Sequence, residues 1–199
     1  MMMRFKVNCR GILLLLPCIA ITLFFLGCKN EDKKTTSINS DQFDIFTAVG
    51  SGDLKLVQNL IRSGVDINVR EPLAKCSPLA LSCVYGHDKI TEWLIENGAD
   101  IDAQNKDRNT PLHIASFHCH EKCIALLLEG GAEVNVRNLK GETPLDIVSY
   151  PWRDDLKRHY IFIHDFFQIP LDIHRIKINR VGIAELLINN GAKLWVVGS

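Results

Sequence analysis

Hydrophobic residues in the middle of the chain recur with the period of a helix that buries one side. Ile90, Leu94 and Ile95 stand at i, i+4 and i+5. A second stripe of the same kind consists of Cys123, Ile124, Leu127 and Leu128. This spacing predicts two amphipathic helices that each pack against a neighbour along one face.

A shorter helix is predicted before each of these stripes. Thr110 and Thr143 are both followed by proline, a pairing typical of a capped helix start with proline at the first helical position. Glycines such as Gly52 and Gly86 can adopt the left-handed conformation that ends a helix, here after about two turns. The pattern therefore predicts pairs of short helices joined by tight turns.

These helix pairs are repeated along the chain. The strings at 77–82, 110–115 and 143–148 align with a spacing of 33 residues, and each begins with Ser or Thr followed by Pro-Leu. A second string, with Gly-Ala-Asp as its clearest form, occurs at 63–68, 97–102, 130–135 and 190–194. A period of this length is the signature of a solenoid of stacked units.

The two strings in register resemble the ankyrin repeat over about residues 41–195. The resemblance implies an all-α solenoid of about four helix pairs within a domain at 41–199. The units span about 41–68, 69–102, 103–135 and 136–195. The first unit has Phe43-Asp-Ile-Phe-Thr-Ala48 in place of the proline string, as end units are commonly atypical. One pair cannot cover its own apolar face, so the units must stack.

The last unit is interrupted by extra residues. Gly191 follows Thr143 by 48 residues, whereas Gly131 follows Thr110 by 21. We expect the additional residues within about 151–178. They contain a helical stripe formed by Leu156, Tyr160, Ile163 and Phe167. We interpret the insertion as a projecting helical hairpin that acts as a lid over the open end of the last repeat, with a partner-binding arm as the alternative.

The first 27 residues have the pattern of a secretory signal peptide. Basic residues up to Arg10 precede an apolar run from Gly11 to Gly27, which is short for a membrane span. An uncleaved N-terminal anchor is the alternative reading.

The sequence Phe25-Leu-Gly-Cys28 resembles a bacterial lipobox, which implies lipidation of Cys28. Residues 28–40 are polar and predict a flexible tether. We therefore expect an exported bacterial membrane lipoprotein of the cell envelope, facing the periplasm or the cell surface.

Composition narrows the function classes. The 199 residues include 23 Lys or Arg and 23 Asp or Glu, so the net charge gives no reason to expect a nucleic-acid-binding protein. A hydrophobic fraction of 47% argues against disorder of the whole chain.

Histidine and cysteine cluster at 118–123. Soft sulfur and imidazole ligands would suit zinc or copper, and this cluster supports the alternative function of a metal-binding or redox helper, or an enzyme. His113 and His120 stand where ankyrin repeats commonly place histidine for hydrogen bonding, and Cys119 stands at the usual glycine site. We therefore expect no metal and no cofactor.

The remaining thiols and acidic groups suggest no chemistry of their own. Four cysteines of the repeat domain are expected to be free thiols rather than disulfides, with no facing pair: Cys76, Cys83, Cys119 and Cys123. The carboxylates and histidines of the insertion match no catalytic motif, and no glycine-rich phosphate loop is present. We predict that the protein is not an enzyme.

A protein-binding surface is the remaining candidate. Tyr85, Phe117 and Tyr150 stand near the end of the first helix in three successive units, and we expect an exposed column of rings. The alternative is that Phe117 and Tyr150 pack on each other. The residues predicted to bind a partner are Tyr85, Phe117, His118, Tyr150, Arg70, Lys106, Arg108 and Lys140.

Together these features predict a monomeric, membrane-tethered module that holds a protein partner. A protective or scaffolding partner of a periplasmic enzyme is a third hypothesis, which rests on the resemblance alone.

Overall fold

The computed structural model describes residues 40–167 and 171–194, and all elements within these ranges are helices. The predicted signal peptide at 1–27, Cys28 and nearly all of the tether at 28–40 lie outside the described residues. The helices are α2 (Ser40–Gly50), α3 (Leu54–Arg62), α4 (Pro78–Tyr85), α5 (Asp88–Glu96), α6 (Pro111–His118), α7 (Glu121–Glu129), α8 (Pro144–Ser149), α9 (Asp154–Phe167) and α10 (Ile173–Asn189).

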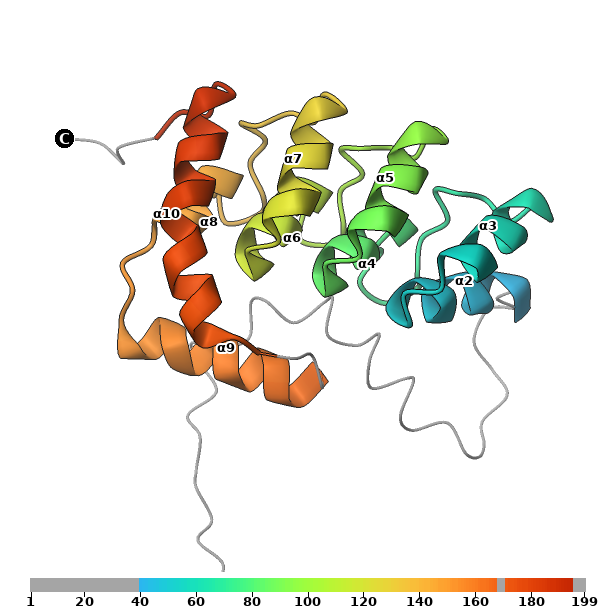
Figure 1. Ribbon diagram of the computed structural model, residues 1–199, viewed down its shortest axis with the longest axis horizontal. Coiled ribbons are helices and arrows are strands. Elements are labelled where there is room, and N and C mark those ends of the chain that lie inside the picture. Colours follow the sequence, from blue (N-terminus) through green and yellow to red (C-terminus); the bar gives the residue numbers. More distant parts are fainter. Residues whose placement is uncertain (1–39, 168–170, 195–199) are drawn as a thin grey trace, which may run out of the picture.

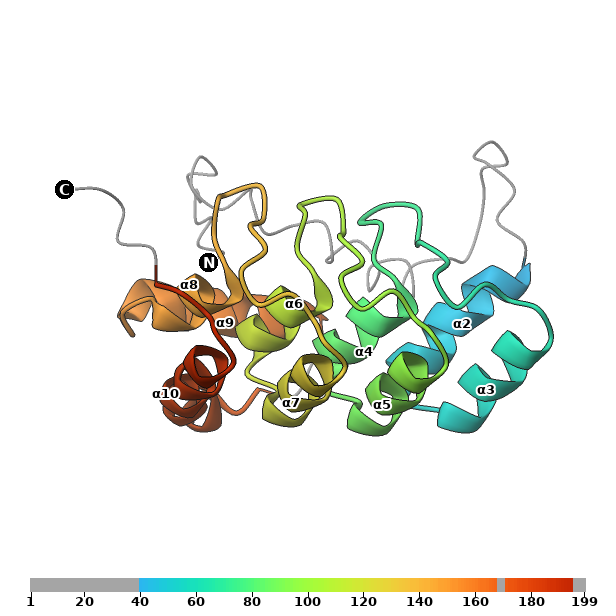
Figure 2. The same cartoon turned by 90° about the horizontal axis from the view of Figure 1, so that it is seen from above.

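The helices are arranged in two rows, as the all-α solenoid expected from the sequence requires. One row contains α2, α4, α6 and α8, and the other contains α3, α5, α7 and α10 (Figures 1 and 2). Long loops project from one edge of the stack (Figure 2). We call the three loop segments 71–76, 105–109 and 138–142 the fingers.

The proline strings form the helix starts that they predict. Ser77, Thr110 and Thr143 are extended N-cap residues whose hydroxyls accept a hydrogen bond from the backbone three residues on. Each is followed by proline at the start of the helix. In the second and third cases the side chain of His113 or Asp146 accepts from the cap N–H in return, which completes a capping box.

Helices α4 and α6 end in left-handed turns, and the second of these turns lacks glycine. Gly86 ends α4 with φ of 71°. Cys119 holds the equivalent place after α6 with φ of 55°, a conformation that strains any residue with a side chain. Cys119 thus stands at the helix-ending site predicted from the alignment.

The core is built from residues that repeat along the stack. Leu79, Leu112 and Leu145, the leucines of the three proline strings, are each fully buried. Leu94 and Leu127 on the second helices are fully buried as well. The apolar stripes therefore meet between neighbouring units, as expected for pairs that cannot cover themselves.

A bond from each unit to the one before it accompanies this packing. The Nε2 atom of His87 lies 3.3 Å from the carbonyl oxygen of Gly50, and that of His120 lies 3.2 Å from the carbonyl oxygen of Val84. A carbonyl can only accept, so both rings donate from Nε2. Gly50 and Val84 lie at or near the ends of α2 and α4, where helix carbonyls lack partners within the helix.

The insertion folds back on the stack. Helix α9 runs crosswise to the repeat helices, below α10 and toward α6 (Figure 1). Tyr160, at the middle of the predicted stripe, is fully buried, and its hydroxyl donates to the carbonyl oxygen of Phe117 at 2.8 Å. Phe117 is the equivalent of Val84, so α9 supplies the bond that histidine supplies in the preceding units.

Arg180 of α10 fixes the position of α9. Its guanidinium is buried and donates to the Tyr160 hydroxyl at 3.1 Å and to the carbonyl oxygens of Ile147 and Tyr150 at 3.0 and 2.9 Å. It also lies 6.0 Å from the ring centroid of Trp152. One side chain thus joins α8, α9 and α10.

The insertion was expected to form a lid over the open end of the last repeat, and this prediction was wrong, because α9 lies elsewhere on the stack. Ile178, Val181 and Ile188 on the outward side of α10 remain exposed. The reason is that Tyr160 bonds the carbonyl oxygen of Phe117 and stacks on its ring at the end of α6, so that α9 packs inward. The side chains of Ile163 and Phe167 lie outside the described part of the structure. Among the described residues, no helix has both the length and the apolar character needed to cross a membrane.

The capping box of α6 predicts a pH dependence of stability. His113 is buried, and burial lowers its pKa to about 4. Its neutral ring accepts from the Thr110 N–H through Nδ1 and donates to the Glu142 carbonyl through Nε2. The unfolded chain therefore takes up this proton near pH 6.5 and the folded chain only near pH 4, so stability falls as pH falls through this window.

We predict that His113→Gln removes this contribution, because glutamine can complete a capping box without titrating. Between pH 7 and pH 4, the free energy of unfolding measured in urea should fall less in this variant than in the wild type, by on the order of 3 kcal/mol. Equal losses in both proteins would show that His113 does not drive the dependence.

Candidate functional site

The fingers are organised by one buried polar residue in each. Asn105 accepts the N–H groups of Asp107 and Asn109 through Oδ1, at 3.0 and 2.9 Å. Asn138 does the same for Lys140 and Glu142, at 2.9 and 3.0 Å. In the first finger the carboxylate of Glu71 accepts from Leu73 at 2.8 Å. The buried polar groups hold each loop in a defined shape.

Neighbouring fingers are also joined to one another. The N–H of Lys106 donates to the carbonyl oxygen of Ala74 at 2.8 Å, and the N–H of Leu139 donates to that of Asp107 at 2.9 Å. The three fingers therefore form one connected edge.

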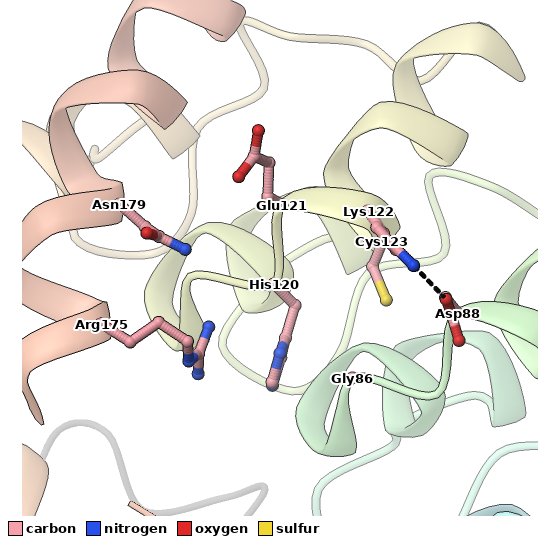
Figure 3. A pocket seen from close by; sticks show the side chains of 8 residues that line it. All are labelled: Gly86, Asp88, His120, Glu121, Lys122, Cys123, Arg175 and Asn179. Atoms are coloured by element: carbon pink, nitrogen blue, oxygen red, sulfur yellow. Dashed lines mark ion pairs between the residues drawn. The ribbon is translucent and has the colours of Figure 1, made fainter. Parts of the chain in front are cut away.

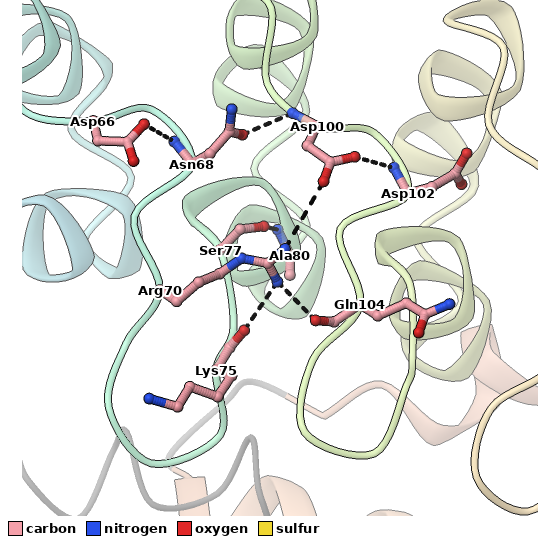
Figure 4. Close-up of polar contacts among 9 residues, drawn as sticks. All are labelled: Asp66, Asn68, Arg70, Lys75, Ser77, Ala80, Asp100, Asp102 and Gln104. Carbon is pink, nitrogen blue, oxygen red and sulfur yellow. Dashed lines mark hydrogen bonds and ion pairs between the residues drawn. The ribbon is translucent and has the colours of Figure 1, made fainter.

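Arg70 is half-buried, and its guanidinium bonds other parts of the protein along this edge. One guanidinium nitrogen donates to the carbonyl oxygens of Lys75 and Gln104, at 3.1 and 2.7 Å, and another lies 3.9 Å from the Asp100 carboxylate (Figure 4). The sequence predicted partner contact at this residue. Its position shows bonds within the protein that join the first finger to the following loop.

The finger tips expose two leucines. Leu73 is 52% exposed and Leu139 is 62% exposed. The exposed cations around them are Lys75, Lys106, Arg108 and Lys140. The sequence analysis predicted the last three of these cations as partner-binding residues but missed both leucines. Both leucines could have been recognised in the sequence, because each is a large apolar residue in a polar turn where the packing of the repeat requires no apolar side chain.

The predicted column of exposed aromatic rings is absent. Tyr85 is partly buried, with its ring against Gly50 and stacked on His87 at a centroid distance of 5.8 Å. Phe117 stacks on Tyr160 at 4.9 Å. Only Tyr150 is largely exposed, at 47%. The expectation of equivalent exposure was wrong for two reasons. Helix α9 covers the ring of Phe117, and Tyr85 aligns with His118 rather than with Phe117 in the 33-residue repeat.

His118 and Tyr150 also have neighbours within the protein. His118 is buried, so its expected exposure was wrong, and its ring meets Phe117 edge-on at 5.1 Å. The Tyr150 hydroxyl donates to the Glu142 carboxylate at 2.6 Å. This hydrogen bond raises the pKa of Tyr150 to about 12, so the phenol stays protonated and ties the end of α8 to the third finger.

The histidines and cysteines at 118–123 do not converge. His120 donates toward the preceding repeat, the thiol of Cys119 bonds the carbonyl oxygen of Ser116 at 3.5 Å, and Cys123 contacts Thr91 at 3.5 Å. Burial raises the pKa of Cys119 to about 11, which keeps it a neutral thiol. Within the described residues, no group of three His, Cys, Asp or Glu side chains lies in position to hold a metal ion.

The four cysteines of the repeat domain are free thiols in the structure. Cys83 and Cys123 nevertheless lie within hydrogen-bonding reach of each other, so the expectation that no pair faces was wrong. The alignment places them in different repeats and on different helices, and the contact arises only when the units stack. Burial raises the pKa of Cys83, and its hydrogen bond lowers that of Cys123.

A shallow pocket of about 250 Å³ opens where the starts of α5, α7 and α10 meet (Figure 3). Its cationic groups already have partners. Lys122 pairs with Asp88 at 3.4 Å, and Arg175 donates to the carbonyl oxygen of Cys119 at 2.8 Å. The pocket is therefore the seam between repeats, and the finger edge is the better candidate for a functional surface.

We predict that Phe117→Ala destabilises the protein, because it removes the ring on which Tyr160 stacks. The expected loss is about 2 kcal/mol or more, which lowers the melting temperature by roughly 5 °C for a chain of this size. Leu139→Ala is the matched control: its side chain is 62% exposed at a finger tip, so melting should change little. Thermal unfolding followed by circular dichroism distinguishes the two. Equal melting temperatures for Phe117→Ala and the wild type would contradict the packing role.

Comparisons with known proteins agree with the repeat architecture. A family model described as "Ankyrin repeats (3 copies)" matches residues 45–138. The human protein phosphatase 1 regulatory subunit 27 is 43% identical over 60 residues, and its mouse counterpart is 42% identical over the same length. Phosphocholine transferase AnkX of Legionella pneumophila is 35% identical over 78 residues.

These matches cover parts of each protein. The shared segment is 30% of this chain and 38% of the human and mouse relatives. For AnkX it is 39% of this chain and 8% of the larger protein. The similarity is therefore one of repeat units.

Proposed function

We propose, from the premise that this chain contains ankyrin repeats at residues 45–138, that the protein is a binding module for another protein. The observation that carries the proposal is the finger edge. Leu73 and Leu139 stand exposed on loops held in shape by buried Glu71 and Asn138. Binding takes place by contact alone, with no reaction on the protein.

The properties of the finger edge suit a protein partner. Exposed leucines offer apolar area that is released from water on contact. The bonds between fingers hold the surface in advance, so little conformational entropy is lost on binding. The three fingers carry four exposed cations beside the partly buried carboxylates of Asp107 and Glu142, and this excess of exposed positive charge favours partner surfaces that carry negative charge.

The relatives support a binding role to different extents. The human and mouse proteins are named as regulatory subunits of a phosphatase, which describes proteins that act on a partner. AnkX is named as a transferase, but the shared segment is a small part of it. We therefore do not transfer the phosphocholine transferase activity to this chain.

We predict that Leu73→Ser with Leu139→Ser weakens capture of the partner at least tenfold, as expected when central apolar contacts are removed. Partners are captured on the wild-type protein, identified by mass spectrometry and measured by titration. Leu56→Ser is the control, since Leu56 is 40% exposed on α3, away from the fingers. Unchanged binding by the double variant, or an equal loss in the control, would refute the proposed surface.

We further propose that the repeat domain is exported and tethered to a membrane through a lipid on Cys28. The support is the sequence: a basic start, an apolar run and a small residue before Cys28, followed by a polar segment. A lipid would hold the domain at the membrane without a spanning helix.

We predict that Cys28→Ala abolishes incorporation of labelled fatty acid and changes processing of the leader. The measurement is metabolic labelling in a bacterial host, followed by immunoprecipitation and mass determination of the mature N-terminus. Cys76→Ala serves as the control for an internal cysteine. Normal labelling of the Cys28 variant would overturn the lipid anchor and leave the finger surface untouched.

A further inference from the structure

The outward side of α10 is an apolar face at the end of the stack. Ile178 is 57% exposed, Val181 65% and Ile188 48%. The opposite side of the same helix is buried through Ile176, Arg180, Ile183 and Leu187.

The outward positions of α10 are those that join repeats elsewhere in the molecule. Alignment on the glycines at 98, 131 and 191 pairs Val181 with Asp88 and Ile188 with Ile95. Asp88 bonds Lys122 of the next repeat at 3.4 Å. The Ile95 side chain packs closely against Gly130 of that repeat: a Cβ atom at Gly130 would lie 2.9 Å from it. The exposed face of α10 thus corresponds to an inter-repeat interface.

The charges on this face are complementary to themselves. Lys177 and Glu185 are both exposed and stand four residues before and four residues after Val181. If two α10 helices met antiparallel across a two-fold axis near Val181, each Lys177 would oppose the Glu185 of the other copy. Val181 would meet Val181 of the other copy at the axis, and Ile178 would lie opposite Ala184. A Cβ atom at Gly182 would have no neighbour within 4 Å, so the space beside this residue is open to a second helix.

We propose that this face binds a second copy of the same chain, so that the protein forms a two-fold dimer through α10. This proposal differs from the monomer that the sequence analysis predicted. The contact would cover little more than one helix face, which is small for a stable dimer. A dissociation constant in the micromolar range is therefore expected, at roughly 1–100 µM.

The test exploits the opposed charges. Lys177→Glu and Glu185→Lys should each weaken dimerisation about tenfold, because each variant creates two like-charge pairs across the axis. The double variant Lys177→Glu with Glu185→Lys restores opposite charges and should return the dissociation constant to within about threefold of the wild type. The measurement is sedimentation equilibrium of the full chain in detergent, over concentrations that span the expected range.

Val181→Asp provides the second arm, since it places a carboxylate at the axis of the dimer. Val181 is exposed in the single chain, so folding should be unaffected by circular dichroism while the dimer is lost. Glu92→Lys on α5, an exposed position away from α10, is the control and should leave the dimer intact. A monomeric wild type over the whole range, or a double charge variant as weak as the single ones, overturns the proposal.

Discussion

The arrangement of the whole stack depends on side chains that donate to carbonyl groups near the end of the preceding unit's first helix. The last turn of a helix leaves carbonyl oxygens without partners, and burying them without a donor costs free energy. His87 and His120 supply the donors for Gly50 and Val84. Each unit thereby fixes the position of its neighbour, and the apolar stripes meet in one register.

The same requirement explains how the last repeat accepts its insertion. The carbonyl oxygen of Phe117 needs a donor, and the hydroxyl of Tyr160 on α9 meets that need. Arg180 then secures the hydroxyl and two further carbonyls. The carbonyl oxygen requires a hydrogen-bond donor at this place, but the donor need not be histidine. A tyrosine on the inserted helix α9 can therefore take the role that His87 and His120 have in the preceding units. The outcome is that α9 packs inward and leaves the outer side of α10 exposed.

The repeats could be predicted from the sequence because their signals are local. Thr110 with its proline and the positions of the helix-ending glycines act within a few residues. The surface could not be predicted equally well, because the exposure of Phe117 depends on where α9 returns, some forty residues along the chain. The contact of Cys83 with Cys123 is likewise a product of stacking. Leu73 and Leu139 could have been identified, since an apolar residue at a turn tip has no role within its own repeat.

The two proposed surfaces lie on different parts of the molecule and can act together. As proposed, the finger edge would hold a partner and the face of α10 would pair two chains, so that one assembly would carry two finger edges. A lipid anchor would confine both chains to one membrane and raise their effective concentration, which makes a weak dimer sufficient. A partner with two matching sites would then be held more tightly than either edge holds it alone, without any additional contact. An end of the stack left uncovered by the insertion would then allow a repeat domain of limited size to present a larger combined binding surface.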